Sequence, residues 1–194
     1  MAFVRRAAKA PEVVAGDSLY LRRLVPGDAC ALLELRAMNR SFLEPFEPAR
    51  AAGFYTLGAQ AREIERDERE ARDESAYPFG IFLRNGDRLI GRIRLSSVVR
   101  GAWHNANLGY FIDQDHNGNG YATHAIGLAV SFAFTTAGLH RVQAAVMTHN
   151  PGSMRALEKN GFRREGFAER YLFINGKWQD HVIFAVTAEE RPPE

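Results

Sequence analysis

A glycine-rich turn between an apolar strand and a helix is the stretch of this sequence best suited to chemistry. Residues 108–112 read LGYFI, a short aromatic and apolar run that predicts a buried strand. A polar turn follows at residues 113–120, and apolar residues then recur at helical spacing over residues 121–138. The first N–H groups of a helix lack intrahelical partners and lie at the positive end of its dipole. The turn therefore predicts an anion site, where Gly118 and Gly120 would let a pyrophosphate touch the backbone.

The same turn is compatible with an ordinary strand–turn–helix connection, so its meaning depends on the elements around it. A helical crossover should place the strand at residues 141–147 parallel to residues 108–112. Together the patterns predict one α+β domain around a mixed, mostly antiparallel sheet flanked by about four helices. The further expected strands are 19–24, 77–84, 88–98, 171–174 and 178–186, and the further expected helices are 28–39, 57–73 and 150–161.

Three local patterns are given a structural interpretation. Asp28 is expected to cap the first helix, and residues 39–48, with two prolines, are expected to form an irregular loop on a pocket wall. The closely interleaved charges of residues 57–73 predict a solvated helical face. The single cysteine, Cys30, lies among alanines and leucines and is expected to be a buried small hydrophobe.

Composition narrows the class of protein. The chain has 194 residues, 46% of them apolar, which suits one domain, and we assign residues 1–17 to a flexible basic arm and residues 18–190 to the domain. A net charge of +2 gives no broad basic face for nucleic acid. Neither a secretory signal nor a membrane span is recognised, so a cytoplasmic protein is expected. The six histidines and one cysteine show no ligand spacing, so no metal is expected.

This order of elements resembles the GNAT superfamily of acyl-CoA-dependent N-acetyltransferases. Within it, the segments that are similar to the RimJ-like, ribosomal-protein-alanine N-acetyltransferase group are NRSFLEPFEPAR at residues 39–50, SVVRGAWHNANLGY at 97–110, NPGSMRALEKNGF at 150–162 and YLFINGKWQDHVIFAVT at 171–187. The resemblance implies acetyl-CoA as co-substrate and a protein N-terminus, beginning with alanine in a ribosomal protein, as acceptor.

The resemblance also implies the residues that bind the cofactor. The pyrophosphate would lie on the turn at residues 115–122, with N–H donors from Asn117 through Ala122, and the pantetheine arm would lie between two strands that splay apart. Asp115 stands where the superfamily usually has Gln or Arg, and its carboxylate must point away from a phosphate. The implied cofactor-binding residues are Phe111, Ile112, Asp113, Asn117, Gly118, Asn119, Gly120, Tyr121, Ala122, Asn150 and Ser153.

Acetyl transfer needs a polarised thioester carbonyl and a proton for the departing thiolate. The resemblance implies a backbone N–H on residues 110–112, freed by a bulge, for the carbonyl. The tyrosine that many members use as acid is replaced by Leu157, and Ser153 is the remaining candidate. Ser153 has an alternative role in stabilising the start of its helix, while Asn150 is expected to cap that helix and bind the pantetheine amides.

The attacking amine must also lose a proton. Other members carry Glu where this chain has Asn107, so the candidates for the base are His104 and Glu47, with water relayed by several polar groups as an equal alternative. Glu47, Asn107 and Tyr171 are the expected substrate-binding residues. A lone histidine beside a tryptophan is more often a packed or surface residue, and this is the alternative for His104 beside Trp103.

Three functions remain open at this point. The first is acetyl transfer to the α-amino group of a protein. The second keeps the fold but acts on a small amine or an antibiotic, and an acidic pocket would favour it. The third is a catalytically degenerate acyl-CoA-binding module, which Leu157 and Asn107 keep open.

Overall fold

The computed structural model describes residues 13–190. Most of the arm predicted at residues 1–17 lies outside this range. At its end, Val13–Ala15 form strand β1 and pair antiparallel with Leu19–Arg22 (β2), and the half-buried Val14 packs against the main core. Residues 13–15 therefore belong to the sheet and not to an arm.

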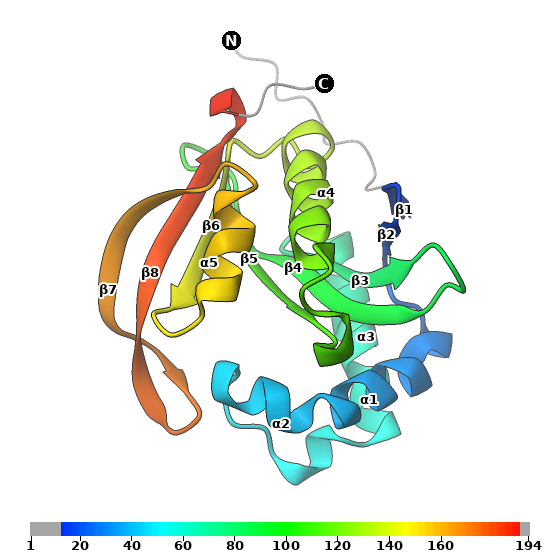
Figure 1. Cartoon of the computed structure of the whole chain (residues 1–194). Helices are drawn as coiled ribbons and strands as arrows, with labels where there is room; N and C mark the ends of the chain where they lie inside the picture. Colours follow the sequence, from blue (N-terminus) through cyan, green and yellow to red (C-terminus); the bar gives the residue numbers. More distant parts are fainter. Residues whose placement is uncertain (1–12, 191–194) are drawn as a thin grey trace.

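The described residues form one eight-stranded sheet in the order β1-β2-β3-β4-β5-β6-β8-β7 (Figure 1). Every neighbouring pair is antiparallel except β5 and β6, which are parallel as the crossover predicted. The predicted α+β class with a mixed, mostly antiparallel sheet is thus confirmed. The remaining strands are β3 (Tyr77–Leu83), β4 (Leu89–Val99), β5 (Asn105–Ile112), β6 (Arg141–Met147), β7 (Arg163–Ile174) and β8 (Lys177–Thr187).

The two halves of the sheet separate between β5 and β6. These strands pair only at residues 105–107 with residues 141–143, although both continue beyond that point. Figure 1 shows β6, β8 and β7 diverging from β5, β4 and β3. The edge of β5 that faces β6 therefore has no strand partner from Leu108 to Ile112, and alternate backbone groups there remain free.

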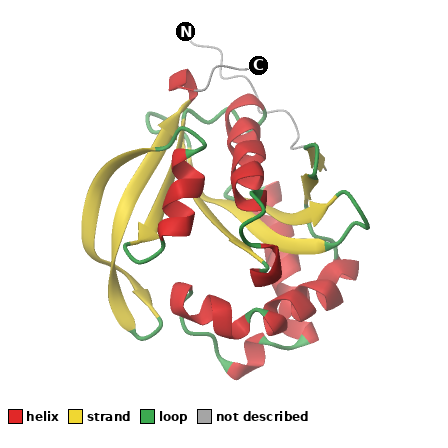
Figure 2. Cartoon of the chain, in the orientation of Figure 1, coloured by secondary structure: helices red, strands yellow, loops and turns green. Residues whose placement is uncertain are grey.

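Helices cover both faces of the sheet (Figure 2). On one face α4 and α5 bury Ile126, Val130 and Leu157 in the larger core, while α1 and α3 bury Leu32 and Ile64 in a smaller one on the other face. The helices in residues 13–190 are α1 (Ala29–Met38), α2 (Arg40–Leu43), α3 (Leu57–Arg72), α4 (Tyr121–Thr135) and α5 (Pro151–Glu158).

Three local predictions were wrong. Residues 40–46 form short helices and not an irregular loop, and Pro45 is tolerated because it falls in the first turn of a 3-10 helix, although the segment does line a pocket as predicted. The Asp28 side chain makes no cap hydrogen bond to α1. Its Oδ2 instead lies 2.6 Å from Arg22 Nη1 in an ion pair. Cys30 is exposed, because α1 turns it away from the core that Leu32 enters.

Candidate active site

One cavity in the described part of the chain lies at the start of α4, between the glycine turn, the end of β5 and α5. It encloses about 710 Å³, and we call it the turn cleft. The structure brings together here all but two of the predicted cofactor-binding residues, which are Phe111, Ile112, Asn117, Gly118, Gly120, Tyr121, Ala122, Asn150 and Ser153.

The turn presents free backbone N–H groups to this cleft. Gly118 and Gly120 have φ angles of +81° and +78°, and a Cβ added at either would meet no atom within 4 Å. Among the described residues, no acceptor is found for the N–H groups of residues 118–123, whereas the Asn117 N–H is bonded to the Gln114 carbonyl at 3.2 Å. The free N–H donors of the turn therefore begin at Gly118, one residue later than the donors that the resemblance implied.

Asp113 and Asn119, the two other residues predicted to bind the cofactor, do not line the turn cleft, and their side chains make hydrogen bonds that stabilise the turn. Asp113 is 2% exposed, accepts a hydrogen bond from Asn39 Nδ2 at 3.0 Å and lies 3.0 Å from His116 Nδ1. Burial alone would raise the pKa of Asp113, but these hydrogen bonds outweigh it and lower the pKa. The Asn119 amide donates to the carbonyls of His116 and Asn117 at 3.2 and 3.3 Å.

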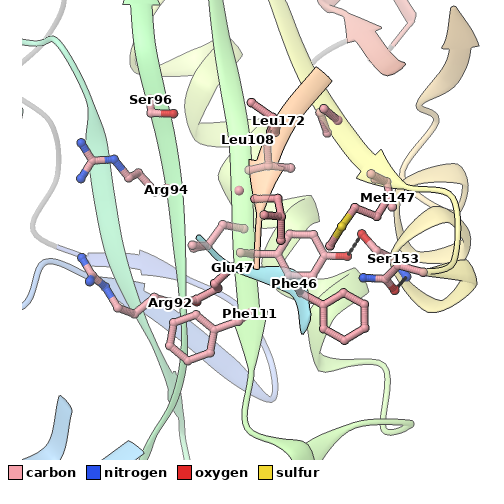
Figure 3. Close-up of a pocket in the computed structure, with 18 of the residues that line it drawn as sticks. Phe46, Glu47, Arg92, Arg94, Ser96, Leu108, Phe111, Met147, Ser153 and Leu172 are labelled. Carbon is pink, nitrogen blue, oxygen red and sulfur yellow. Dashed lines mark hydrogen bonds between the residues drawn. The ribbon is translucent and has the colours of Figure 1, made fainter. Parts of the chain in front are cut away.

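The second cavity lies on the α1 and α3 side of β4 and β5 and extends to the β7–β8 hairpin. It encloses about 380 Å³, and we call it the arginine pocket. Figure 3 shows Arg92, Arg94 and Ser96 in a row on one side of it, with Met147 and Ser153 on the other. The charged residues that line it are Arg36, Arg50, Arg66, Arg92, Arg94, Glu47 and Glu63.

A buried ion-pair network forms the wall of this pocket. Most charged side chains of α3 are exposed, as the prediction of a solvated face requires, but Asp67 is an exception. Asp67 is 5% exposed and pairs with Arg92 and with Arg94, the latter at 2.7 Å, and Arg94 also pairs with Glu70. Burial is the larger influence on the pKa of Asp67 and raises it, although both arginines favour the carboxylate. The sequence showed the charges of α3 but did not show that its carboxylates pair with arginines of β4.

The two cavities meet where β5 and β6 separate. Glu47 lies at this junction, with its carboxylate 2.5 Å from Arg36 Nη1 and 3.6 Å from Arg50 Nε. The Arg36 guanidinium also lies over the ring of Phe111, 4.2 Å from its centroid. The residues that line both cavities are Phe46, Glu47, Tyr110, Phe111, Asn150 and Ser153.

Ser153 occupies the junction in a defined hydrogen-bonded setting. Its N–H donates to Asn150 Oδ1 at 3.1 Å, which confirms Asn150 as the cap of α5. Its Oγ accepts a hydrogen bond from Tyr110 Oη at 2.9 Å, drawn as the dashed line beside Ser153 in Figure 3. Leu157, where the superfamily often has a tyrosine, is fully buried and also lines the arginine pocket.

The structure does not bring His104 to this junction. His104 precedes β5 at the end where β5 and β6 still pair, and its ring is bonded to the Gly101 carbonyl. Six residues of extended chain, roughly 20 Å at about 3.3 Å each, separate it from Tyr110. At that distance its ring cannot take a proton from an amine bound at the junction.

The two other predicted substrate residues lie beside the arginine pocket without lining it. Asn107 is opposite Ser96 on β4, and Ser96 donates to the Asn107 carbonyl at 3.3 Å. Tyr171 is 40% exposed on β7 and packs edge-on against His181, which lines the pocket. Neither side chain is placed for direct contact at the junction.

The bulge that the resemblance implied in β5 is not found there. The pairing of β5 with β4 runs without a register shift from Ile112 back to Asn107, and the irregularity lies further on, between Ser96 and Val99 of β4. The loss of β6 as a partner, not a bulge, leaves backbone donors free on residues 108–112.

Several residues of both cavities are not predicted from the sequence. Tyr110 belongs to the predicted strand, and nothing in the sequence singles out its hydroxyl. Arg155 of α5 and Lys159, which follows its last residue, line the turn cleft, and their spacing of four residues was a signal that could have been used. Arg36, Arg92 and Arg94 carried no signal, because they become neighbours only through the fold.

In residues 13–190 no group of three or more His, Cys, Asp or Glu side chains is arranged to hold a metal ion. In the same residues, none of the helices combines the length and the apolar character that a membrane span requires.

Known proteins are similar to this chain in sequence and in fold. The family model described as "Acetyltransferase (GNAT) domain" matches residues 18–163. The chain is 46% identical over 172 residues to a probable N-acetyltransferase, YjcK, of Bacillus subtilis, covering 88% of this chain and 94% of that protein. It is 38% identical over 178 residues to the [ribosomal protein uS5]-alanine N-acetyltransferase of Escherichia coli, covering 91% of each.

A solved structure has a similar fold. The structure described as Mycobacterium smegmatis RimJ in complex with CoA-disulfide superposes with a TM-score of 0.87 at 33% identity, covering 94% of this chain and 88% of that one. The prediction of an acetyl-CoA-dependent N-acetyltransferase is thereby confirmed, and a degenerate binding module is not supported. The chain belongs to the GNAT acetyltransferase family.

Proposed function

We propose that this N-acetyltransferase moves the acetyl group of acetyl-CoA to the α-amino group of a protein, and that its acceptor is the N-terminal alanine of a ribosomal protein. The observation that supports the proposal best is the meeting of two cavities at Glu47, Tyr110 and Ser153. One cavity suits an elongated anionic donor and the other an acceptor that enters from the opposite side. The relative that acts on ribosomal protein uS5 supports the choice of acceptor.

The turn cleft provides what the donor needs. The free N–H groups after Gly118 would hold the pyrophosphate, and Arg155 and Lys159 would neutralise further phosphate charge. The pantetheine arm would replace the missing strand partner along residues 108–112 of β5. That path brings the thioester to the junction, with its carbonyl oxygen against a free backbone N–H of β5.

The chemistry then follows from the groups at the junction. The neutral amine attacks the thioester carbonyl carbon, the C–S bond breaks with its electron pair on sulfur, and the amide nitrogen loses one proton while the sulfur gains one. We assign Glu47 as the base that takes the proton from the amine, directly or through a water. We assign Ser153 as the group that hydrogen-bonds to the departing sulfur. This assignment keeps two of the three predicted catalytic residues and leaves out His104.

The charges of the arginine pocket favour a peptide over a polyamine. Both lining glutamates are already paired with arginines, Glu47 with Arg36 and Glu63 with Arg66 at 2.8 Å. A polyamine would therefore find no unpaired carboxylate there for its second ammonium group, and like charges would face it. A peptide offers one amine followed by backbone amides, which does not require an acidic pocket.

A competition assay tests this function. Peptides with N-terminal alanine, peptides of the same sequence with a blocked N-terminus, and spermidine would be offered with acetyl-CoA, and kcat/KM measured for each. We expect turnover of the free alanine peptides at least tenfold above that of spermidine, and none of the blocked peptides. A higher kcat/KM for small amines than for every peptide would contradict the acceptor proposed here. We also propose a cytoplasmic location, because a ribosomal protein would be met there.

A further inference from the structure

The hydroxyl groups of Tyr110 and Ser153 form a contact that neither the sequence nor the resemblance assigned. They come from different elements, β5 and α5, and lie 2.9 Å apart with Tyr110 as the donor. Both residues line the turn cleft as well as the arginine pocket. The pair therefore lies where the sulfur of acetyl-CoA arrives, if the donor is placed as in the proposed function.

The direction of this hydrogen bond decides where the serine proton points. A hydroxyl has one hydrogen to donate and two lone pairs that accept, and Tyr110 occupies one lone pair of Ser153 Oγ. Serine in a helix often donates to the carbonyl four residues earlier, but no such bond to His149 is found. Among the described residues the serine hydrogen has no acceptor, and it is free to point into the junction.

Burial keeps the tyrosine in its donating form. Burial raises the pKa of Tyr110 above the ordinary value of 10.0, although the hydrogen bond to Ser153 acts in the opposite direction. Tyr110 therefore remains protonated across the pH range in which the enzyme would work. The hydrogen bond that Ser153 accepts polarises its hydroxyl and so strengthens the hydrogen bond that this hydroxyl donates.

We propose that Tyr110 is a positioning residue that holds the Ser153 hydroxyl with its hydrogen directed at the thioester sulfur. As the C–S bond breaks, its electron pair stays on sulfur and the Ser153 hydrogen bond stabilises the thiolate. The proton that the amide nitrogen releases balances the one that the thiolate takes up from solvent. The pair would thus take the place of the tyrosine that many members of the superfamily have at the position of Leu157.

The test measures the pKa of the thiol of bound CoA, from the ultraviolet absorbance of its thiolate, in wild type and in the Y110F, S153A and double variants. We expect a pKa below that of free CoA in wild type and a rise toward the free value in both single variants. The double variant should match S153A, because Tyr110 acts only through Ser153. Turnover of an alanine peptide should show kcat reduced roughly tenfold in Y110F, with the KM for acetyl-CoA unchanged.

Two controls separate this role from packing. Y20F removes a tyrosyl hydroxyl that is bonded to Asp87 outside both cavities, and it should leave the thiol pKa and kcat at wild-type values. Should Y110F fail to fold, 3-fluorotyrosine at position 110 keeps the ring and makes the hydroxyl a stronger donor, so the thiol pKa should fall below wild type.

A thiol pKa that is unchanged in Y110F, or a full-sized change that persists in the S153A background, would overturn the proposal. The proposal rests on CoA binding in the turn cleft, but its thiol measurement needs no acceptor. If wild type turns over no peptide, the proposed acceptor fails while the thiol measurement still decides the role of Tyr110.

Discussion

The turn cleft and the arginine pocket differ in what builds them. At its glycine turn, the turn cleft presents backbone groups of one contiguous stretch, residues 118–123, and hydrogen bonds of Asn119 within the turn and of Asn39 to Asp113 stabilise its shape. The arginine pocket uses side chains from α1, α3, β4, β5 and the last hairpin, joined by ion pairs between distant residues. A site made of local backbone can be recognised in a sequence, whereas a site made of distant side chains cannot.

The same difference predicts which kinds of substitution should impair each cavity. The glycine turn of the turn cleft should be sensitive to changes of backbone conformation, because its donors are backbone N–H groups. The arginine pocket should be sensitive to the loss of single charges, because each buried charge depends on a partner from another element. Three substitutions test this contrast.

The largest effect is expected from Asp67→Asn. Arg92 and Arg94 would lose their buried partner, and breaking a buried pair typically costs about 3–5 kcal/mol of the free energy of unfolding. Chemical denaturation followed by circular dichroism measures it. Glu68→Gln, an exposed neighbour on α3, is the matched control and should change stability by less than about 0.5 kcal/mol. A loss for Asp67→Asn no larger than that of the control would show that the arginine pocket does not depend on the network.

Gly120→Val should weaken acetyl-CoA binding by roughly a hundredfold or more, with calorimetry as the measurement. Gly120 has φ +78° at the start of α4, and a branched side chain would both strain the turn and fill the path of the phosphates. Gly86→Val is the control, since Gly86 has φ +80° in the β3–β4 turn, outside both cavities. Its backbone strain is comparable, so it should lose stability but retain affinity. Equal affinities for the two variants would remove the glycine turn from the binding site.

Glu47→Gln should lower kcat/KM for the acceptor by roughly ten- to a hundredfold and leave the affinity for acetyl-CoA nearly unchanged. The amide keeps an oxygen for Arg36 but can no longer take a proton. Steady-state kinetics with an alanine peptide measure it, and Glu44→Gln, an exposed residue of the same segment, serves as control. Wild-type kinetics in Glu47→Gln would favour a water relayed by other groups as the base.

Sequence reasoning recovered most of the fold because its signals are local. The strand at residues 108–112, the helix that starts at Tyr121 and the Asn150 cap follow from apolar spacing, glycine and proline positions and capping chemistry. The same reasoning failed at residues 39–48, where the prolines suggested a loop and the chain forms short helices. Proline in a first turn is permitted, so its presence alone does not separate the two outcomes.

By itself, the sequence determined the glycine turn, the strands and helices around it and the family they point to, because each depends on neighbours within a few residues. Only the tertiary structure decided which charges of α3 are buried, that Tyr110 donates to Ser153, and that Glu47 reaches the junction while His104 does not. These facts depend on the register of β4 against β5 and on the separation of β5 from β6. Side chains that are distant in the chain become neighbours only when those strands pair, and no local pattern records that pairing.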